Sequence, residues 1–216
     1  WNNDEIANRI KRYDSVGWQV AVHTQGDRAI SETLDAFEKS GIPKNSRHRL
    51  EHCLLPSKKD IQRMAKLGVS PSFHINHLWY YGEALEDHII GRERTDKILP
   101  LKAAENNSLI FSLHADQPMF ESNPLSLLHT AVNRKTRDGK IVGKSNKITV
   151  EQGLKSLTIN AAWQIKMENK IGSIKPGKYA DFVIIDQNPM MVDPEKIKDI
   201  HVLQTIVSGN IIYKKD

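Results

Sequence analysis

The sequence contains one cysteine and no long apolar stretch, and each shortage excludes a class of protein. The single Cys53 cannot form an internal disulfide, which fits a reducing compartment and predicts a cytoplasmic protein. No segment approaches the roughly 18 consecutive apolar residues of a membrane helix, so we expect no membrane partner. The opening segment, residues 1–5, lacks the charged and apolar regions of a signal peptide, although a signal on a longer precursor would leave no trace here.

A long block of one charge sign is also absent. Lys and Arg total 31 against 26 Asp and Glu, which gives a net charge of +5. Basic residues stand among acids, as in Lys58-Lys59-Asp60, and no nucleic-acid recognition motif accompanies them. We therefore expect no nucleic-acid partner. With 216 residues, 39% of them hydrophobic, the chain can bury the core of one domain with a small appendage.

Strand-like and helical patterns alternate along most of the chain. Strand-like apolar runs fall at 18–24, 47–54, 69–75 and 109–115. Helical patterns fall at 3–15, 26–41, 57–68, 95–107 and 124–136. This βαβαβαβα order predicts four parallel strands with right-handed crossovers. Residues 76–94 show weak periodicity and are long for a connection, which predicts a functional loop.

The C-terminal part of the chain has a different pattern of predicted secondary structure. One more helix is expected over 149–165, and Arg134 is expected at the solvated end of the helix before it. From Ile171 onward short strands and turns prevail, with a Pro-Gly turn at 176–177 and a hairpin at 208–210. We predict two domains, one over residues 1–165 and the other over residues 166–216.

Metal-ligand side chains stand at the ends of three predicted strands. Strand alternation places His23, His52, His114 and Asp116 on one interior face, with His48 and Leu50 on the face of His52. The carboxyl ends of neighbouring parallel strands meet at one edge, where (β/α) barrels gather their chemistry. A lone strand-end histidine is more often a packed or capping residue, and Asp116 before Gln-Pro could cap a helix. Three such residues in phase favour a site.

This combination of side chains suits a metal-dependent reaction. Neutral imidazoles and a carboxylate bind zinc well, and iron and manganese are alternatives. Such a cation lowers the pKa of bound water toward 7. Asp116 is the candidate general base beside that water.

Several motifs, taken in order, resemble the amidohydrolase superfamily. They are His23-Thr-Gln-Gly-Asp-Arg-Ala29, Arg49-Leu-Glu-His52, His114-Ala-Asp116-Gln-Pro118, Thr158-Ile-Asn-Ala-Ala162 and the stretch 171–186. The closest resemblance is to amidohydrolase family 3, the branch of YtcJ-like and N-substituted formamide deformylase-like proteins. It runs over nearly the whole chain, and the ordered set is far more specific than any one motif.

The resemblance implies an α/β fold, namely the C-terminal half (strands five to eight) of a (β/α)8 TIM barrel plus part of a small β-sandwich. It implies a hydrolase that cleaves non-peptide C–N bonds of a small amide or formamide through a metal-activated water. His23 and His52 would be metal ligands, and Asp116 the general base. The family's His-x-His pair on strand one and its strand-four ligand have no counterpart in this sequence, so we expect the chain alone to be incomplete for catalysis.

Some roles stay open at this level. His77, His114 and Trp79 are candidates for substrate contact, and the alternative is packing within their own segments. The rival function is a non-catalytic C-terminal fragment that self-associates as a homo-oligomer or requires the missing N-terminal half as a partner. Four open strands leave two unpaired edges and an uncovered face, which favours such association.

Overall fold

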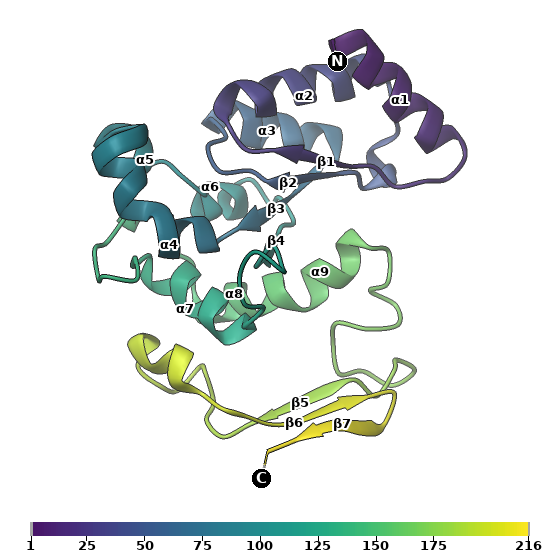
Figure 1. Cartoon of the computed structure of the whole chain (residues 1–216). Coiled ribbons are helices and arrows are strands. Elements are labelled where there is room, and N and C mark those ends of the chain that lie inside the picture. The colour runs from purple at the N-terminus through teal and green to yellow at the C-terminus, as the bar shows by residue number, and fades with distance from the viewer. Residues whose placement is uncertain (1, 216) are drawn as a thin grey trace.

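The computed structural model describes residues 2–215, which form a parallel sheet flanked by helices and a separate antiparallel sheet (Figure 1). The parallel sheet has the order β1-β2-β3-β4, so strands adjacent in sequence are adjacent in space, as the βα alternation predicts. Its strands are β1 (Ala21–Thr24), β2 (Arg49–His52), β3 (Ser70–His74) and β4 (Ser112–His114). All three pairings are parallel.

Helices cover the outer face of this sheet. They include α1 (Asn3–Ser15), α2 (Asp27–Ser40), α3 (Lys58–Leu67), α6 (Leu101–Asn106) and α7 (Pro124–Asn133). Between the layers Phe37 and Phe73 are fully buried in the main apolar core. Local signals set the helix ends: the Ser57 side chain accepts from the backbone of Asp60 and begins α3. Gly68 ends α3 with a φ of 70°, and a Cβ there would lie 2.3 Å from a backbone oxygen.

The segment 76–94 is helical, so the predicted loop is wrong. It forms α4 (Asn76–Ala84), a π-helical turn η2 (Leu85–Ile89) and α5 (Arg92–Thr95). Two features hide this helix from a periodicity analysis. Gly82 packs closely against the side chains of Thr136 and Val142, and the π turn shifts the residue spacing from 3.6 per turn.

Two predicted helices are shorter or broken. The helix expected over 95–107 begins only at Leu101, because Leu99 has a φ of 47° and Pro100 follows it. The helix expected over 149–165 is two helices, α8 (Val150–Leu157) and α9 (Ile159–Gln164). They are separated at Thr158, whose φ and ψ are −126° and −94°.

Arg134 is buried, so its predicted place at a solvated helix end is wrong. Its guanidinium donates hydrogen bonds to the backbone oxygens of Ile98, Leu99 and Val142 at 2.8–3.1 Å. Residue 134 has a φ of 59° and ends α7. The side chain therefore joins α7 to the segment before α6. Burial lowers the pKa of this guanidinium to about 9.

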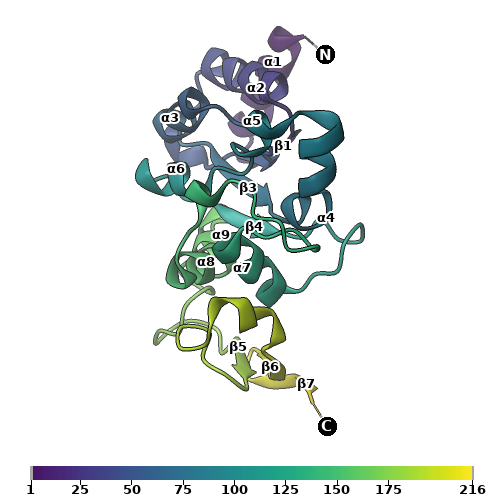
Figure 2. The same ribbon diagram turned by 90° about the vertical axis from the view of Figure 1, so that its left-hand side faces the viewer.

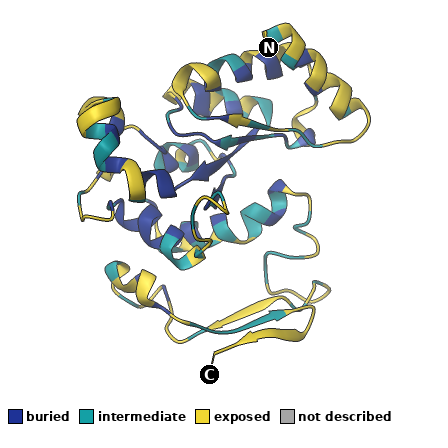
Figure 3. Ribbon diagram, in the orientation of Figure 1, coloured by how far each residue is buried: buried dark blue, intermediate teal, exposed yellow. Residues whose placement is uncertain are grey.

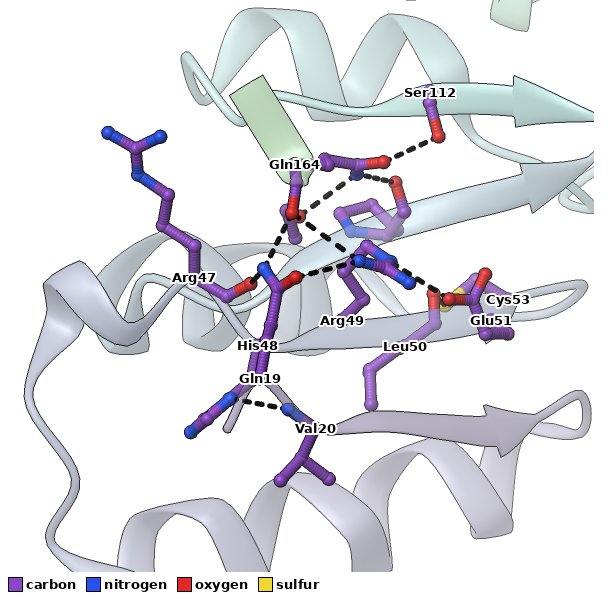
Figure 4. Close-up of polar contacts among 12 residues, drawn as sticks. Gln19, Val20, Arg47, His48, Arg49, Leu50, Glu51, Cys53, Ser112 and Gln164 are labelled. Carbon is purple, nitrogen blue, oxygen red and sulfur yellow. Dashed lines mark hydrogen bonds and ion pairs between the residues drawn. The ribbon is translucent and has the colours of Figure 1, made fainter. Parts of the chain in front are cut away.

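The inner face of the parallel sheet carries polar side chains held by Gln164 of α9 (Figure 4). The Gln164 amide accepts from the Ser112 hydroxyl at 2.6 Å and donates to the Ser70 hydroxyl at 2.9 Å. Its backbone oxygen accepts from Gln19 and from Arg49. One residue of α9 thus contacts side chains from all parts of the sheet at the amino ends of the strands.

The predicted phase of β2 is wrong over most of the strand. His48 and Leu50 face the helices, and the His48 ring stacks on Phe37 with centroids 5.7 Å apart. Figure 4 shows the His48 ring beside Val20, apart from the group around Arg49. Arg49 instead pairs with Glu51 on the inner face, at 2.9 Å. Because the charged residues Arg49 and Glu51 lie on the inner face, the rule that polar residues point outward predicts the wrong face for this strand.

The C-terminal sheet consists of β5 (Phe182–Ile185), β6 (Val202–Val207) and β7 (Asn210–Lys214), paired antiparallel in that order. The predicted hairpin turn is present between β6 and β7. This sheet lies at the opposite end of the molecule from α1 (Figure 2). Ile197 of the 3-10 helix η4 (Pro194–Asp199) is buried against Leu128 of α7 and links it to the barrel portion. Most residues of the C-terminal strands β5, β6 and β7 are exposed (Figure 3).

The remaining elements are the short 3-10 helices η1 (Lys44–Ser46) and η3 (Lys144–Asn146). None of the helices within residues 2–215 combines the length and the apolar character needed to cross a membrane.

Candidate functional site

The carboxyl ends of the four parallel strands bring histidines together. His52, His74 and His114 are the last residues of β2, β3 and β4, and His23 is the penultimate residue of β1. The His23 and His52 rings lie with centroids 4.5 Å apart, and His52 and His114 lie 5.1 Å apart. His52 belongs to this cluster although the inward and outward positions predicted for the rest of β2 are wrong. Its backbone and that of Cys53 have φ values of 72° and 45°, which interrupt the alternation at the strand end.

Asp116 joins this cluster from just beyond β4. Its φ is 61°, a left-handed conformation, and its side chain is 40% exposed toward the pocket. One ligand atom from each of His52, His114 and Asp116 lies within 4.8 Å of the others. The structure therefore brings together the predicted residues His23, His52, His114 and Asp116 at one end of the sheet.

His74 belongs to the cluster and was missed in the sequence analysis. It is fully buried, its ring stacks on His114 at 4.9 Å, and its Nδ1 lies 4.0 Å from Asp116 Oδ2. A signal was present: in β3 alternation puts Ser70, Ser72 and His74 on one face, and His74 occupies the strand end. The predicted strand ran to Ile75, which hid that position.

Burial favours the neutral form of four of these imidazoles, those of His52, His74, His77 and His114. Burial, followed by the neighbouring His77 and His114 rings, lowers the pKa of His74 to about 2. Burial and the His52 ring lower the pKa of His77 to about 4. Burial also lowers the pKa of His52 and of His114. Each ring thus keeps a nitrogen lone pair, the form in which histidine binds a metal.

Several ring nitrogens of these histidines have no hydrogen-bond partner. Among residues 2–215 the ring nitrogens without a hydrogen-bond partner include His52 Nδ1, His74 Nδ1, His74 Nε2, His77 Nδ1 and His114 Nε2. Buried polar atoms are nearly always paired in folded proteins. Neutral imidazoles with free nitrogens beside a carboxylate therefore fit a divalent transition-metal ion.

A pocket of 640 Å³ opens above the cluster. Its polar lining comprises His23, Gln25, His52, His77 and Asp116, and its apolar lining comprises Leu54, Tyr81, Leu85, Ile89 and Met119. Tyr81, Leu85 and Ile89 of this apolar lining come from α4 and the π turn, the segment predicted as a functional loop. A small organic molecule could rest on this wall with its polar group at the histidines.

His77 and Trp79, which were predicted to contact the substrate, lie in different places. His77 lines the pocket, and its Nε2 lies 3.0 Å from the Gln25 amide nitrogen. Trp79 lies away from the pocket: its ring stands edge-on to His129 of α7 at 5.6 Å, and Lys198 of η4 lies over it. The structure does not bring Trp79 to the site, because residues 77 and 79 lie on different sides of α4.

Comparison with known proteins identifies the relatives of this chain. Residues 2–213 match the profile of the Amidohydrolase family. The chain is 27% identical to the N-substituted formamide deformylase of Arthrobacter pascens and 28% identical to the YtcJ protein of Bacillus subtilis. These alignments cover 100% and 99% of this chain but only 40% and 41% of the relatives. The chain therefore spans about two fifths of the length of these relatives. The resemblance inferred from the motifs is confirmed.

Solved structures give the same result for the fold. An uncharacterized metal-dependent hydrolase from Pyrococcus furiosus superimposes with a TM-score of 0.76 at 26% identity, covering 88% of this chain and 38% of that one. Its counterpart from Pyrococcus horikoshii gives 0.77 at 25% identity, covering 90% and 39%. A zinc-bound adenosine deaminase from Xanthomonas campestris gives 0.70 at 16% identity, covering 97% and 48%, which supports the fold alone. The predicted half of a (β/α)8 barrel is confirmed.

Proposed function

The chain belongs to the amidohydrolase family, and from this we propose that it carries part of the active site of a metal-dependent hydrolase acting on a non-peptide C–N bond. The substrate we propose is a small amide or formamide. The observation that supports this most is the meeting of His23, His52 and Asp116 at one pocket, at the carboxyl ends of adjacent parallel strands. The family match favours this enzyme over a non-catalytic module.

His23 and His52 are the proposed ligands of a divalent cation, which we propose is zinc. The unpaired Nδ1 of His52 and the edge-on His23 ring support this assignment. A cation bound here would act as a Lewis acid that acidifies a water molecule and polarises the substrate carbonyl. The neutral state of the surrounding histidines keeps their nitrogens available for it.

Asp116 is the proposed general base. Its partly exposed carboxylate faces the pocket and can accept a proton from the attacking water. After the oxygen adds to the carbonyl carbon, the same carboxyl gives this proton to the departing nitrogen. The C–N bond breaks, and the products are a carboxylic acid and an amine. His77, beside Gln25, is placed to contact the substrate polar group.

The surroundings of the site suggest how the protein is organised. We propose that residues 1–165 are the catalytic portion and residues 166–216 the sandwich portion. The parallel sheet ends at β1 and β4 within the described residues, and both edges are free to pair. A second copy, or a further part of a protein as long as the relatives, would complete the barrel. A reduced Cys53 supports a cytoplasmic location.

An assay of amine release tests the proposal. The chain would be loaded with Zn²⁺, Mn²⁺ or Fe²⁺ in turn and offered a panel of N-alkyl and N-aryl formamides and acetamides. We expect hydrolysis that is lost in Asp116→Asn and His52→Ala, because one removes the base and the other a ligand. Trp79→Phe is the matched control, since Trp79 lies outside the pocket. Hydrolysis that persists in Asp116→Asn would contradict the proposed base, and its absence with every metal would show that the part of the active site in this chain does not suffice for catalysis.

A further inference from the structure

The segment between β4 and α7, residues 115–123, contains no helix or strand and carries the proposed base Asp116. Between this residue and the cap of α7, Phe120 is the one residue that is not exposed. We propose that Phe120 is a positioning residue, whose packing on Tyr80 and Tyr81 of α4 holds the turn that places Asp116 at the pocket. The inference rests on the proposed function, because it takes Asp116 as the base.

The ring of Phe120 contacts aromatic rings of two other elements. It stacks on Tyr80 with centroids 4.6 Å apart and planes 19° apart, and it stands edge-on to Tyr81 at 5.9 Å. It also lies 5.3 Å from the ring of His74, at the end of β3. Aromatic pairs attract one another at centroid separations of about 4.5–7 Å. Phe120 therefore attaches its segment to both α4 and the end of β3.

The residues between Asp116 and Phe120 form a turn. The backbone N–H of Met119 donates to the backbone oxygen of Asp116 at 2.9 Å, which closes the turn over 116–119. Within residues 2–215 no hydrogen bond joins residues 117–122 to another element. The packing of Phe120, the residue directly after the turn, is therefore the main contact between this turn and α4.

The backbone of Asp116 requires such support. Its φ of 61° is a left-handed conformation, which Asp adopts more readily than most residues but which remains uncommon. Conformations of this kind persist where the surrounding structure holds them. The nearest printed partner of its carboxylate is His74 Nδ1 at 4.0 Å, too far for a hydrogen bond. The backbone, and with it the turn, therefore sets the direction in which the carboxylate points.

The contact also joins two walls of the pocket. Tyr81 and Asp116 both line the pocket, whereas Phe120 is not among its lining residues. A substrate that rests on Tyr81 thus lies against the same helix to which the turn of Asp116 is attached. A general base must lie within hydrogen-bond reach of the proton that it takes. Phe120 would hold the base at that reach without contacting the substrate itself.

Phe120 is not a residue of the apolar cores. It belongs to neither of the two clusters of buried apolar side chains within the described residues, and it is only partly buried. Its replacement by alanine should therefore leave the fold intact while it releases the turn. This difference separates a positioning role from a role in stability, and circular dichroism would verify that each variant is folded.

A spin label on the turn tests the inference directly. Met119 is 60% exposed, so a nitroxide can be attached to the full chain carrying Met119→Cys. The native Cys53 is fully buried, and burial raises the pKa of its thiol, so it does not compete for the label. We expect a slow line shape in paramagnetic resonance spectra. Addition of Phe120→Ala should produce a fast component, because the turn is then free to move on the time scale of loops.

Two further variants complete the design. Phe120→Tyr keeps the ring and should restore the slow line shape. Tyr13→Ala is the matched control, because it removes a contact between aromatic rings, Tyr13 and Trp18 at 6.4 Å, in α1 and the segment after it. It should leave the label unchanged.

Kinetics of the unlabelled variants give a second measurement. In the amine-release assay Phe120→Ala should lower kcat by about 10–100-fold, because misplacement of a catalytic group by about 1 Å can cost about 100-fold. KM should change little, since Phe120 lies outside the pocket. Phe120→Tyr should regain the original kcat.

Two outcomes would overturn the inference. One is a line shape that Phe120→Ala leaves unchanged or that Tyr13→Ala alters equally. The other is a mobile label with an unchanged kcat, since the turn would then not position the base. The line shape requires no hydrolysis, so it decides the inference even if this chain proves inactive. The base itself is tested separately by Asp116→Asn, so failure of the proposed function and failure of this inference can be told apart.

Discussion

The side-chain amide of Gln164 links β3 to β4, because it accepts from Ser112 at 2.6 Å while it donates to Ser70 at 2.9 Å. Gln164 is 3% exposed and lies 52 residues from Ser112 in the chain. The contact holds the amino ends of the strands whose carboxyl ends carry His74 and His114. The geometry of the candidate site therefore depends on a residue at the other end of the sheet.

Replacing this amide should destabilise the fold. Gln164→Leu keeps a similar volume but leaves the Ser70 and Ser112 hydroxyls and the Pro71 carbonyl without their partner. We expect the free energy of unfolding to fall by about 2 kcal/mol or more. Urea denaturation followed by circular dichroism would measure it. The exposed Gln62→Leu is the control and should change stability by no more than about 0.5 kcal/mol. Equal effects of the two changes would contradict a linking role for Gln164.

A second stability prediction concerns Arg134. Arg134→Met removes the donors to three backbone oxygens that stay buried, those of Ile98, Leu99 and Val142. Hydrogen bonds from charged groups contribute about 1.5–3 kcal/mol each, so we expect a loss of at least about 3 kcal/mol in unfolding free energy. Thermal unfolding by calorimetry would detect it. Lys135→Met, which removes only a partly exposed ion pair with Glu195, should cost less than about 1 kcal/mol. An Arg134 variant as stable as the Lys135 variant would argue against this role.

The candidate site was partly predictable from the sequence because of a general property of parallel sheets. Successive strands end at one edge, so His23, His52 and Asp116 could be placed together from the order of strands alone. Helix boundaries set by local chemistry, such as Ser57 and Gly68, were predictable for the same kind of reason. Neither inference needed contacts between distant residues.

What the sequence did not reveal depends on such distant contacts. Arg49 resembles a solvent-facing residue, yet it lies inside because Gln19 and Gln164, 30 and 115 residues away, accept its hydrogen bonds. This reversed the expected phase of β2. Arg134 similarly finds its acceptors 35 and 36 residues away. The π turn at 85–89 changes the helical period, so periodicity could not identify that helix.

A pH prediction follows from His48, which lies outside the candidate site. Burial lowers its pKa, and the nearby Asp14 opposes this only partly. The folded state therefore holds His48 neutral, while the unfolded chain protonates it near its ordinary pKa of about 6.5. The unfolded state then binds more protons, so this histidine lowers the unfolding free energy as the pH falls through and below about 6.5. Above that pH it has no such effect.

Urea denaturation between pH 8 and pH 5 would measure this dependence. In His48→Gln the decline on acidification should be smaller than in the unaltered chain, because one buried titrating group is gone. The exposed His88→Gln is the control and should keep the original slope. Identical slopes in all three proteins would show that His48 is not a source of the acid sensitivity.

The last prediction concerns the C-terminal sheet, whose apolar side chains lie at the surface. Val183 and Tyr213, which both pair with Thr205 and so share a face of the sheet, are 56% and 48% exposed, and the edges at β5 and β7 are unpaired within residues 2–215. Exposed apolar side chains and open edges favour association, so we expect the chain to self-associate. Sedimentation velocity would show it. Val183→Lys should shift the equilibrium toward monomer, because it places a charge on the same face as Tyr213, whereas a change at the exposed Asp199 of η4, Asp199→Lys, should not. A chain that stays monomeric before any substitution would show that this sheet does not mediate contacts between copies, and that the apolar surface is too small or too discontinuous to offset the entropy lost on association.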